Sequence, residues 1–282
     1  MEFIDFLLKH HSKGTAKRYE KEVLSFLFSV DKKTVDYQRV MDYLAEQRAR
    51  GKQATSVSLA AIKRYFDYEI FKGKRTDHPA KTIHLKDKVS KDIQLQDLFT
   101  SAELESLLER KERYVLLKNR NQIIIGLLIY QALTKAELCS LLVSDINLES
   151  GSIKIKGSRK INARTLKLKP KQLYVLKSYL TEDRPKLVRD ETDYLLIGKL
   201  GKAEMGEGIT YLIETARKEF YPRELNLRTI RQSVISNLLK DGHDLRIVQA
   251  FAGHKYPSTT ERYRQTGIEQ LQTAIERHHP LR

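Results

Sequence analysis

The sequence predicts a mainly α-helical protein with a small antiparallel β element, folded into two domains. Most periodic segments repeat apolar residues every three or four positions, which is the pattern of helices with one buried face. One segment, residues 152–168, instead alternates apolar and polar side chains around a basic middle, and this pattern predicts a β-hairpin. At roughly 150 residues per domain, the 282 residues of the chain leave room for two modest cores.

A helical first domain is predicted over residues 1–75. Its four expected helices cover residues 2–10, 15–29, 38–50 and 55–71. Gly51 suits the helix stop between the last two. The periodicity then ends, Pro79 interrupts the chain and basic residues become frequent, so residues 76–98 are predicted to form a basic linker.

The second domain is predicted over residues 99–282. The pattern Thr100-Ser-Ala-Glu103 is typical of a capping box that opens a helix. Gly242 and Gly253 stand where left-handed helix caps are expected. Further helices, predicted from apolar spacing, cover residues 121–133, 135–143, 171–180, 210–220, 227–240, 245–252 and 268–277.

The charge of the chain indicates a polyanionic partner. The chain carries 52 Lys and Arg against 36 Asp and Glu, a formal net charge of +16. Residues 1–98 hold 20 basic and 14 acidic side chains, and residues 99–282 hold 32 and 22, so both domains are basic. Binding of both domains along a phosphate backbone explains this excess. A solvated surface without a partner is the alternative.

Several classes of protein are excluded by composition. The single thiol, Cys139, allows neither a disulfide framework nor a Cys-based zinc finger. The longest apolar run, residues 123–133, is shorter than the ~20 residues that cross a bilayer. Residues 1–9 include two acidic side chains, unlike a signal peptide. The glycine-rich stretch 198–208 lacks the Gly-Lys-Ser/Thr of a nucleotide loop. We therefore expect a soluble, cytoplasmic protein without cofactor or metal.

An ordered string near the end of the chain carries the functional signal. Arg228 and Arg231 lie three residues apart on one predicted helix face, His254 follows a helix-ending glycine, and Tyr263 lies nine residues further on. Taken singly, each has an ordinary explanation: a solvated arginine face, a helix cap, a core tyrosine. Together, Arg228-Thr-Ile-Arg231-Gln-Ser, Ala252-Gly-His254 and Ser258-Thr-Thr-Glu-Arg-Tyr263 resemble the tyrosine recombinase (phage integrase) family.

The resemblance implies a two-domain clamp around double-stranded DNA and a strand-cutting reaction. Tyr263 would be the nucleophile, forming a 3′-phosphotyrosyl link and a free 5′-hydroxyl. Arg231 and His254 would bind the scissile phosphate. Because the phosphodiester bond energy is kept in the covalent link, rejoining needs neither ATP nor metal. The resemblance further implies a homotetramer assembled on DNA, with an accessory DNA-bending protein or a partner recombinase as possible additions.

Three positions depart from the family pattern. Aligning Glu137-Leu138 with the family's Glu-Leu places Thr134 where the first catalytic arginine is expected. Arg228 stands where the family has a histidine. Ser158 stands where the hairpin lysine is expected. Loss of one preorganised donor typically costs about 10²–10³ in rate, so compensation is needed for full activity.

We hypothesise that Arg228 supplies the missing positive charge. Lys160 is the favoured general acid for the 5′-oxygen leaving group. The residues considered as further substitutes are Thr134, Lys135, Lys156 and Arg159. Two alternatives stay open at this point: Arg228 contacts a neighbouring DNA phosphate instead, or the chain is a catalytically impaired, recombinase-like DNA-binding protein with an architectural or regulatory role. Tyr256 and Tyr221 are the less favoured candidates for the nucleophile.

Overall fold

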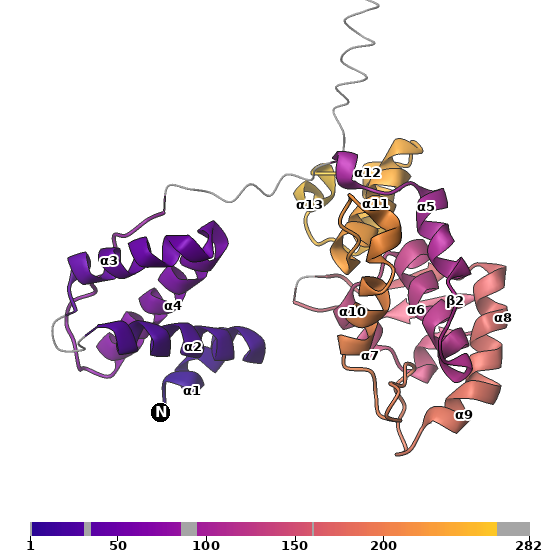
Figure 1. Cartoon of the computed structure of the whole chain (residues 1–282), viewed down its shortest axis with the longest axis horizontal. Coiled ribbons are helices and arrows are strands. Elements are labelled where there is room, and N and C mark those ends of the chain that lie inside the picture. Colours follow the sequence, from indigo (N-terminus) through magenta and orange to yellow (C-terminus); the bar gives the residue numbers. More distant parts are fainter. Residues whose placement is uncertain (1, 31–34, 86–94, 160, 264–282) are drawn as a thin grey trace, which may run out of the picture. The chain divides into compact units, whose positions relative to one another are not determined.

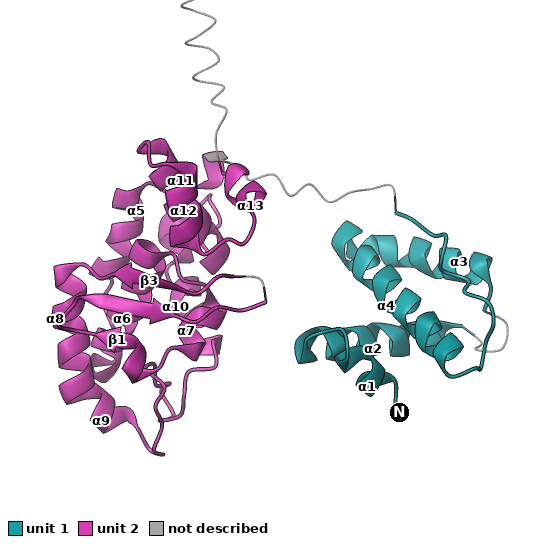
Figure 2. Cartoon of the chain, turned by 180° about the vertical axis from the view of Figure 1, so that it is seen from behind, with its two compact units in different colours: residues 1–91 teal, residues 92–282 magenta. Residues whose placement is uncertain are grey.

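The computed structural model describes residues 2–30, 35–85, 95–159 and 161–263 and divides into two compact units (Figures 1 and 2). Unit 1 is Met1–Lys91 and unit 2 is Asp92–Arg282. The predicted fold class is confirmed: the chain is mostly helical with a small antiparallel sheet. No helix among the described residues is long and apolar enough to cross a membrane.

Unit 1 is a bundle of helices. Side-chain oxygens of Ser12 and Asp36 accept the backbone N–H groups of Thr15 and Arg39, which fixes where α2 and α3 begin. Helices α2 and α4 pack on each other around a core centred on buried aromatic side chains. The elements are α1 (Phe3–Leu8), α2 (Lys13–Ser29), α3 (Tyr37–Gln47), η1 (Arg48–Arg50) and α4 (Lys52–Phe71), so the four predicted helices are found within a few residues.

Part of the segment expected to be a linker packs on unit 1. Ala80 and Ile83 are buried in its core. Arg75 donates from Nη2 to the carbonyl oxygen of Val35 at 2.9 Å, and His78 lies 3.2 Å from the carbonyl oxygen of Lys63. The structure therefore adds residues 76–85 to the first unit, because two apolar side chains in this basic segment find a place in the core.

Unit 2 is built around the apolar helix α6 (Lys118–Gln131), which is buried along most of its length. It packs against α5 (Ser101–Ser106), α8 (Pro170–Ser178) and α11 (Leu227–Lys240). The predicted capping box is present, since Thr100 and Glu103 exchange side-chain and backbone hydrogen bonds at the start of α5.

The predicted hairpin is confirmed and gains one strand. The sheet consists of β1 (Ile146–Asn147), β2 (Ser152–Ile155) and β3 (Arg164–Lys167), all antiparallel in the order β1-β2-β3. Ile153 pairs with Ile146 on one side and Leu166 on the other. Beyond the strands, Ile161 pairs with His254, and Asn162 donates its N–H to the carbonyl oxygen of Gly253 at 2.8 Å. The hairpin tip is thereby joined to the end of a helix about ninety residues later in the chain.

Two predicted helices end earlier than expected. Helix α7 (Lys135–Ser140) stops before residue 143 because the carbonyl oxygen of Leu141 accepts the N–H of Leu195 at 2.8 Å, which draws the chain into an extended conformation. The single helix predicted over residues 210–220 is wrong: the structure has α10 (Glu207–Glu214) followed by a separate 3₁₀ turn. The predicted helix at residues 268–277 lies outside the described residues.

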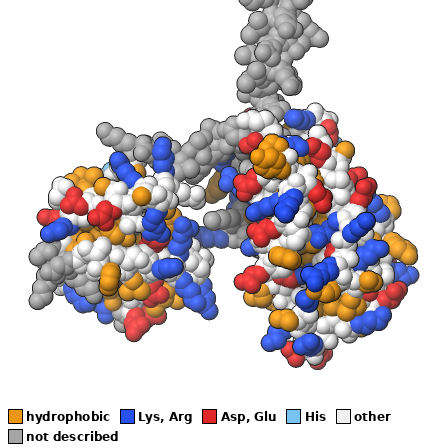
Figure 3. Space-filling model, viewed as in Figure 1, with side chains coloured by type: hydrophobic (Ala, Val, Ile, Leu, Met, Phe, Trp, Pro, Cys, Tyr) orange, Lys and Arg blue, Asp and Glu red, His pale blue; other side chains and the backbone are white. Residues whose placement is uncertain are grey.

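The remaining elements complete unit 2. Gly242 and Gly253 have positive φ, as predicted for left-handed caps. Figure 3 shows Lys and Arg side chains spread over the visible face of both units, interspersed with acidic ones. The other elements are η2 (Leu95–Asp97), η3 (Leu107–Glu109), η4 (Val115–Leu117), η5 (Val143–Asp145), η6 (Tyr179–Asp183), α9 (Arg184–Leu187), η7 (Arg217–Phe220), α12 (Leu245–Ala252) and α13 (Pro257–Glu261).

A buried ion pair anchors the glycine-rich segment of unit 2. Arg120 on α6 donates to Glu204, and the side chains are 5% and 6% exposed. Glu204 also accepts the backbone N–H groups of Gly206 and Gly208 at 2.9 and 3.0 Å. The carboxylate thus holds this loop against the central helix.

We expect Glu204→Ala to lower the free energy of unfolding of unit 2 by about 3–5 kcal/mol, because it leaves the buried Arg120 charge uncompensated. The matched control is Glu214→Ala, whose partner Arg217 is, like Glu214, 45% exposed. We expect the control to cost less than about 1 kcal/mol. Urea denaturation followed by circular dichroism measures both, and equal losses in the two variants would contradict this assignment.

Candidate active site

Three side chains from the end of the chain meet in unit 2. Arg231 lies on α11, His254 follows α12, and Tyr263 follows α13. Figures 1 and 2 both show these three helices next to one another at one end of the unit. The residues singled out by their order in the sequence are therefore neighbours in space.

The guanidinium of Arg231 is held by backbone carbonyl groups. Nη1 donates to the carbonyl oxygen of Ala132, and Nη2 donates to that of Ala252 at 2.6 Å. Ala132 ends α6 with a positive φ of 52°, and Ala252 ends α12. Nη1 also lies 4.0 Å from a carboxylate oxygen of Glu137. These hydrogen bonds fix the plane of the guanidinium, so its remaining N–H groups are preorganised for binding phosphate oxygens.

The imidazole of His254 is buried and neutral at pH 7. Its Nδ1 lies 2.9 Å from the hydroxyl of Thr260 on α13. Burial lowers the pKa of His254 to about 4, and the positive charges of Arg231 and Arg164 add to the effect. A Thr260 hydroxyl that donates to Nδ1 leaves the proton on Nε2, which can then donate to a phosphate oxygen.

The phenol of Tyr263 stacks on this imidazole. The two ring centroids are 6.1 Å apart and the ring planes differ by 17°. Burial raises the pKa of Tyr263, whereas the charges of Arg231, Arg228 and Arg262 act to lower it. The neutral phenol therefore lies in the field of three arginines, which favours development of negative charge on its oxygen.

Arg228 is exposed in the first turn of α11, and its charge acts on Tyr263. The structure thus places Arg228, Arg231, His254 and Tyr263 in one region. The other two candidate nucleophiles differ from Tyr263, since Tyr256 is 70% and Tyr221 is 85% exposed.

Two of the considered substitutes are engaged elsewhere. The hydroxyl of Thr134 donates to Glu137 at 2.8 Å and caps α7. Nζ of Lys135 lies 3.4 Å from the hydroxyl of Thr210 on α10, and its aliphatic carbons lie against Gly206. The ammonium of Lys135 therefore faces α10.

The basic hairpin tip lies beside His254 through the pairing of Ile161. Lys156 is exposed, with Nζ 3.9 Å from a carboxylate oxygen of Asp145. Arg159 is exposed, and Lys160 lies outside the described residues. Of this segment, Ile161 and Asn162 are the residues that contact the backbone at Gly253 and His254.

Sequence reasoning missed two charged members of this site, Arg164 and Glu137. Nη1 of Arg164 on β3 donates to Glu137 at 2.5 Å, and the two side chains are 6% and 8% exposed. Burial acts to raise the pKa of Glu137, but hydrogen bonds from Arg164 and Thr134 keep it below its ordinary value. The sequence signal that could have revealed the pair is Glu137 itself. It lies in a largely apolar segment, and a carboxylate that is buried there requires a cationic partner.

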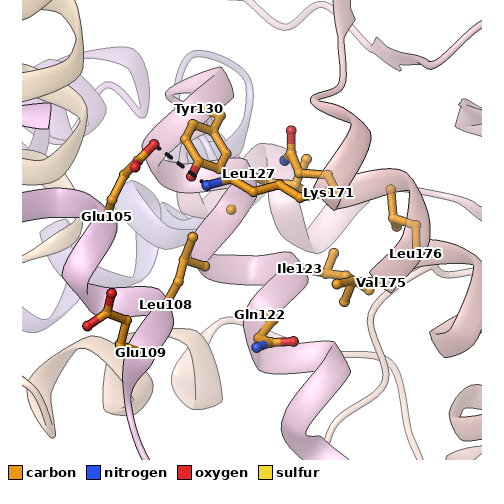
Figure 4. A pocket seen from close by; sticks show the side chains of 12 residues that line it. Glu105, Leu108, Glu109, Gln122, Ile123, Leu127, Tyr130, Lys171, Val175 and Leu176 are labelled. Carbon is orange, nitrogen blue, oxygen red and sulfur yellow. Dashed lines mark ion pairs between the residues drawn. The ribbon is translucent and has the colours of Figure 1, made fainter. Parts of the chain in front are cut away.

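A separate hollow of about 340 Å³ lies between η3, α6 and α8 (Figure 4). Its lining is mostly apolar, with Tyr130, Glu105 and Lys171 at one side, the last two 3.8 Å apart. It shares no residue with the arginine, histidine and tyrosine cluster, so the hollow is not part of that site.

Family models match both units. The model of the phage integrase family matches residues 97–269, and that of the phage integrase N-terminal SAM-like domain matches residues 1–73. Similar curated proteins are named tyrosine recombinases. XerD of Listeria monocytogenes is 28% identical over 99% of this chain and 97% of its own length. XerA of Pyrococcus furiosus is 29% identical over 98% of this chain and 92% of its own length.

Solved structures share the fold. The XerH recombinase bound to a palindromic difH substrate aligns with a TM-score of 0.71 at 21% identity, covering 90% of this chain and 76% of that one. A lambda integrase dimer bound to a core site aligns with a TM-score of 0.70 at 14% identity, covering 93% of each chain. With one family model spanning more than half of its length and a second matching its first unit, this chain is a tyrosine recombinase of the phage integrase family.

Proposed function

We propose that this chain cuts and rejoins DNA at specific sites through a 3′-phosphotyrosyl link on Tyr263, in integration, excision or resolution. The observation that carries the proposal is the stacking of Tyr263 on His254 beside the guanidinium of Arg231. A nucleophile, a neutral imidazole and a fixed cation in one cluster suit attack on a phosphodiester.

In this mechanism the phenol oxygen attacks phosphorus in line with the 5′ oxygen. The phenol releases its proton to solvent as the new bond forms, and the bond from phosphorus to the 5′ oxygen breaks. Lys160, or in second place Lys156, gives its proton to the leaving oxygen. Arg231 and Nε2 of His254 donate to the non-bridging oxygens, where negative charge concentrates in the transition state. Arg228 adds positive charge from the protein surface.

The family and the charge of the chain support a proposal for its DNA partner and its assembly. The basic excess of both units suits a clamp on double-stranded DNA, and the XerH and lambda integrase structures are DNA complexes. We propose that four protomers assemble on paired sites in the cytoplasm, with a DNA-bending protein or a second recombinase joining where the target requires it. Gel filtration with and without paired sites separates assembly on DNA from assembly in its absence.

We expect Tyr263→Phe to abolish the covalent protein–DNA adduct, because it removes the attacking oxygen. The substrate is a nicked suicide duplex containing a site selected from a random-sequence pool by binding to the protein, and the readout is an SDS-resistant band. Tyr256→Phe is the matched control, since Tyr256 is exposed and begins α13, and it should form the adduct at the wild-type rate. Absence of any adduct with wild-type protein on such a site would favour the architectural or regulatory alternative.

We expect Arg228→Ala to slow cleavage of this substrate by about tenfold. The effect should be smaller than the 10²–10³ of a buried preorganised donor, because water and salt screen an exposed charge. Lys240→Ala at the other end of α11 removes an exposed charge from the same helix and should leave the rate unchanged. If Arg228→Ala and Arg228→His both cleave like wild type, Arg228 does not compensate for the departures from the family pattern.

The lowered pKa of His254 makes unfolding depend on pH. Below pH 6.5 the unfolded chain takes up a proton on this imidazole, whereas the folded chain resists protonation until the pH nears 4, so stability is lost as the pH falls through this window. Relative to His254→Gln, wild type should lose on the order of 2 kcal/mol more unfolding free energy between pH 7 and pH 5. Urea denaturation at both pH values measures this, and an equal loss in the two proteins would show that His254 is not shielded.

A further inference from the structure

The active site contains a buried cluster with more positive than negative charge. Arg164 and Arg231 flank the carboxylate of Glu137, with Nη1 of Arg164 at 2.5 Å from one oxygen and Nη1 of Arg231 at 4.0 Å from the other. The three side chains are 6%, 11% and 8% exposed. His254 beside them is neutral at pH 7 and therefore does not alter this balance.

Arg164 has donors without acceptors. Its Nε and Nη2 are buried, and neither has a hydrogen-bond partner among the described residues. A buried donor without a partner is rare and costly, and a buried charge needs full compensation. One carboxylate shared by two guanidiniums leaves one positive charge uncompensated. An anion that enters the site supplies both the missing charge and the missing acceptors.

Arg164 lies close to Thr134, the position at which the family pattern expects an arginine, because both residues bind Glu137. Thr134 and Arg164 donate to the two oxygens of the same Glu137 carboxylate. A Cβ atom built on Gly253 would lie 2.7 Å from Nη1 of Arg164, so the guanidinium lies against the backbone just before His254. A guanidinium from β3 thus reaches the carboxylate of Glu137 on α7, to which the N-cap residue Thr134 offers only a hydroxyl.

We propose that Arg164 binds the scissile phosphate and supplies the second guanidinium of the site. Nη1 stays on Glu137 and fixes the plane of the group, while Nε and Nη2 donate to a non-bridging phosphate oxygen. Lys135, the cation next to Thr134 in the sequence, has its ammonium directed to α10. This inference rests on the proposed phosphotyrosyl reaction and assigns it a phosphate ligand.

The test compares two nicked suicide duplexes, one with an ordinary scissile phosphate and one with a methylphosphonate at that position. A methyl group in place of a non-bridging oxygen removes the negative charge that Arg164 would neutralise. On the ordinary substrate, Arg164→Ala should slow Tyr263-dependent adduct formation about 10²–10³-fold relative to wild type. On the methylphosphonate, the deficit should shrink to less than about tenfold, because the charge is no longer present.

The matched control is Arg223→Ala. Arg223 donates to Glu103, which closes the capping box of α5 as Glu137 closes that of α7. The control therefore removes the same kind of ion pair outside the site, and it should cleave both substrates like wild type. Arg164→Lys keeps the charge and the pairing with Glu137, and it serves as the second variant if thermal denaturation shows that Arg164→Ala is unfolded. It loses the donors that face the phosphate but keeps the charge, so on the phosphate it should be slowed less than Arg164→Ala, and this smaller deficit should also shrink on the methylphosphonate.

The outcomes separate this inference from the function on which it rests. No adduct with wild-type protein would remove the proposed function itself. Wild-type cleavage with an equal deficit of the Arg164 variants on both substrates would mean that Arg164 only supports Glu137, and the inference would be overturned. Wild-type rates in both Arg164 variants would also overturn it. A deficit confined to the charged substrate supports it.

Discussion

The candidate active site depends on the interactions of one carboxylate, that of Glu137. It closes the cap of α7 through Thr134, holds Arg164 from β3 and lies 4.0 Å from Arg231 on α11. Helix α7, strand β3 and helix α11 therefore all contact one buried carboxylate. Its low pKa keeps it charged, so the two guanidiniums remain fixed before any DNA arrives.

The excess positive charge around this carboxylate explains the state of the other groups. With Arg164 and Arg231 nearby, protonation of the buried His254 is unfavourable, and the imidazole remains a neutral hydrogen-bonding group. Positive charge also lowers the pKa of Tyr263, where it favours loss of the phenol proton and opposes the effect of burial. In the mechanism we propose, one charge distribution therefore prepares both the phosphate-binding groups and the nucleophile for a dianionic transition state.

Departures from the family pattern need not be repaired at the positions where they occur. Thr134 keeps the helix cap but carries no charge, and the replacement cations we propose come from elsewhere in the fold: Arg228 from the surface of α11 and Arg164 from β3. A phosphate responds to the field at its location, whichever element supplies the charge. Under this proposal, a comparison of sequence motifs alone underestimates the positive charge available at the site.

The sequence by itself determined the elements and the order of the reactive residues. Periodic apolar spacing located the helices of unit 1, and the alternation at residues 152–168 located the hairpin, because these patterns reflect local backbone geometry. A nearly continuous apolar run located the central helix α6. Only the tertiary structure decided where α7 ends, that residues 76–85 join unit 1, and that Arg164 meets Glu137. These outcomes depend on partners far away in the chain, such as the pairing of Leu141 with Leu195 or of β3 with α7, and such contacts form only when the whole unit is folded.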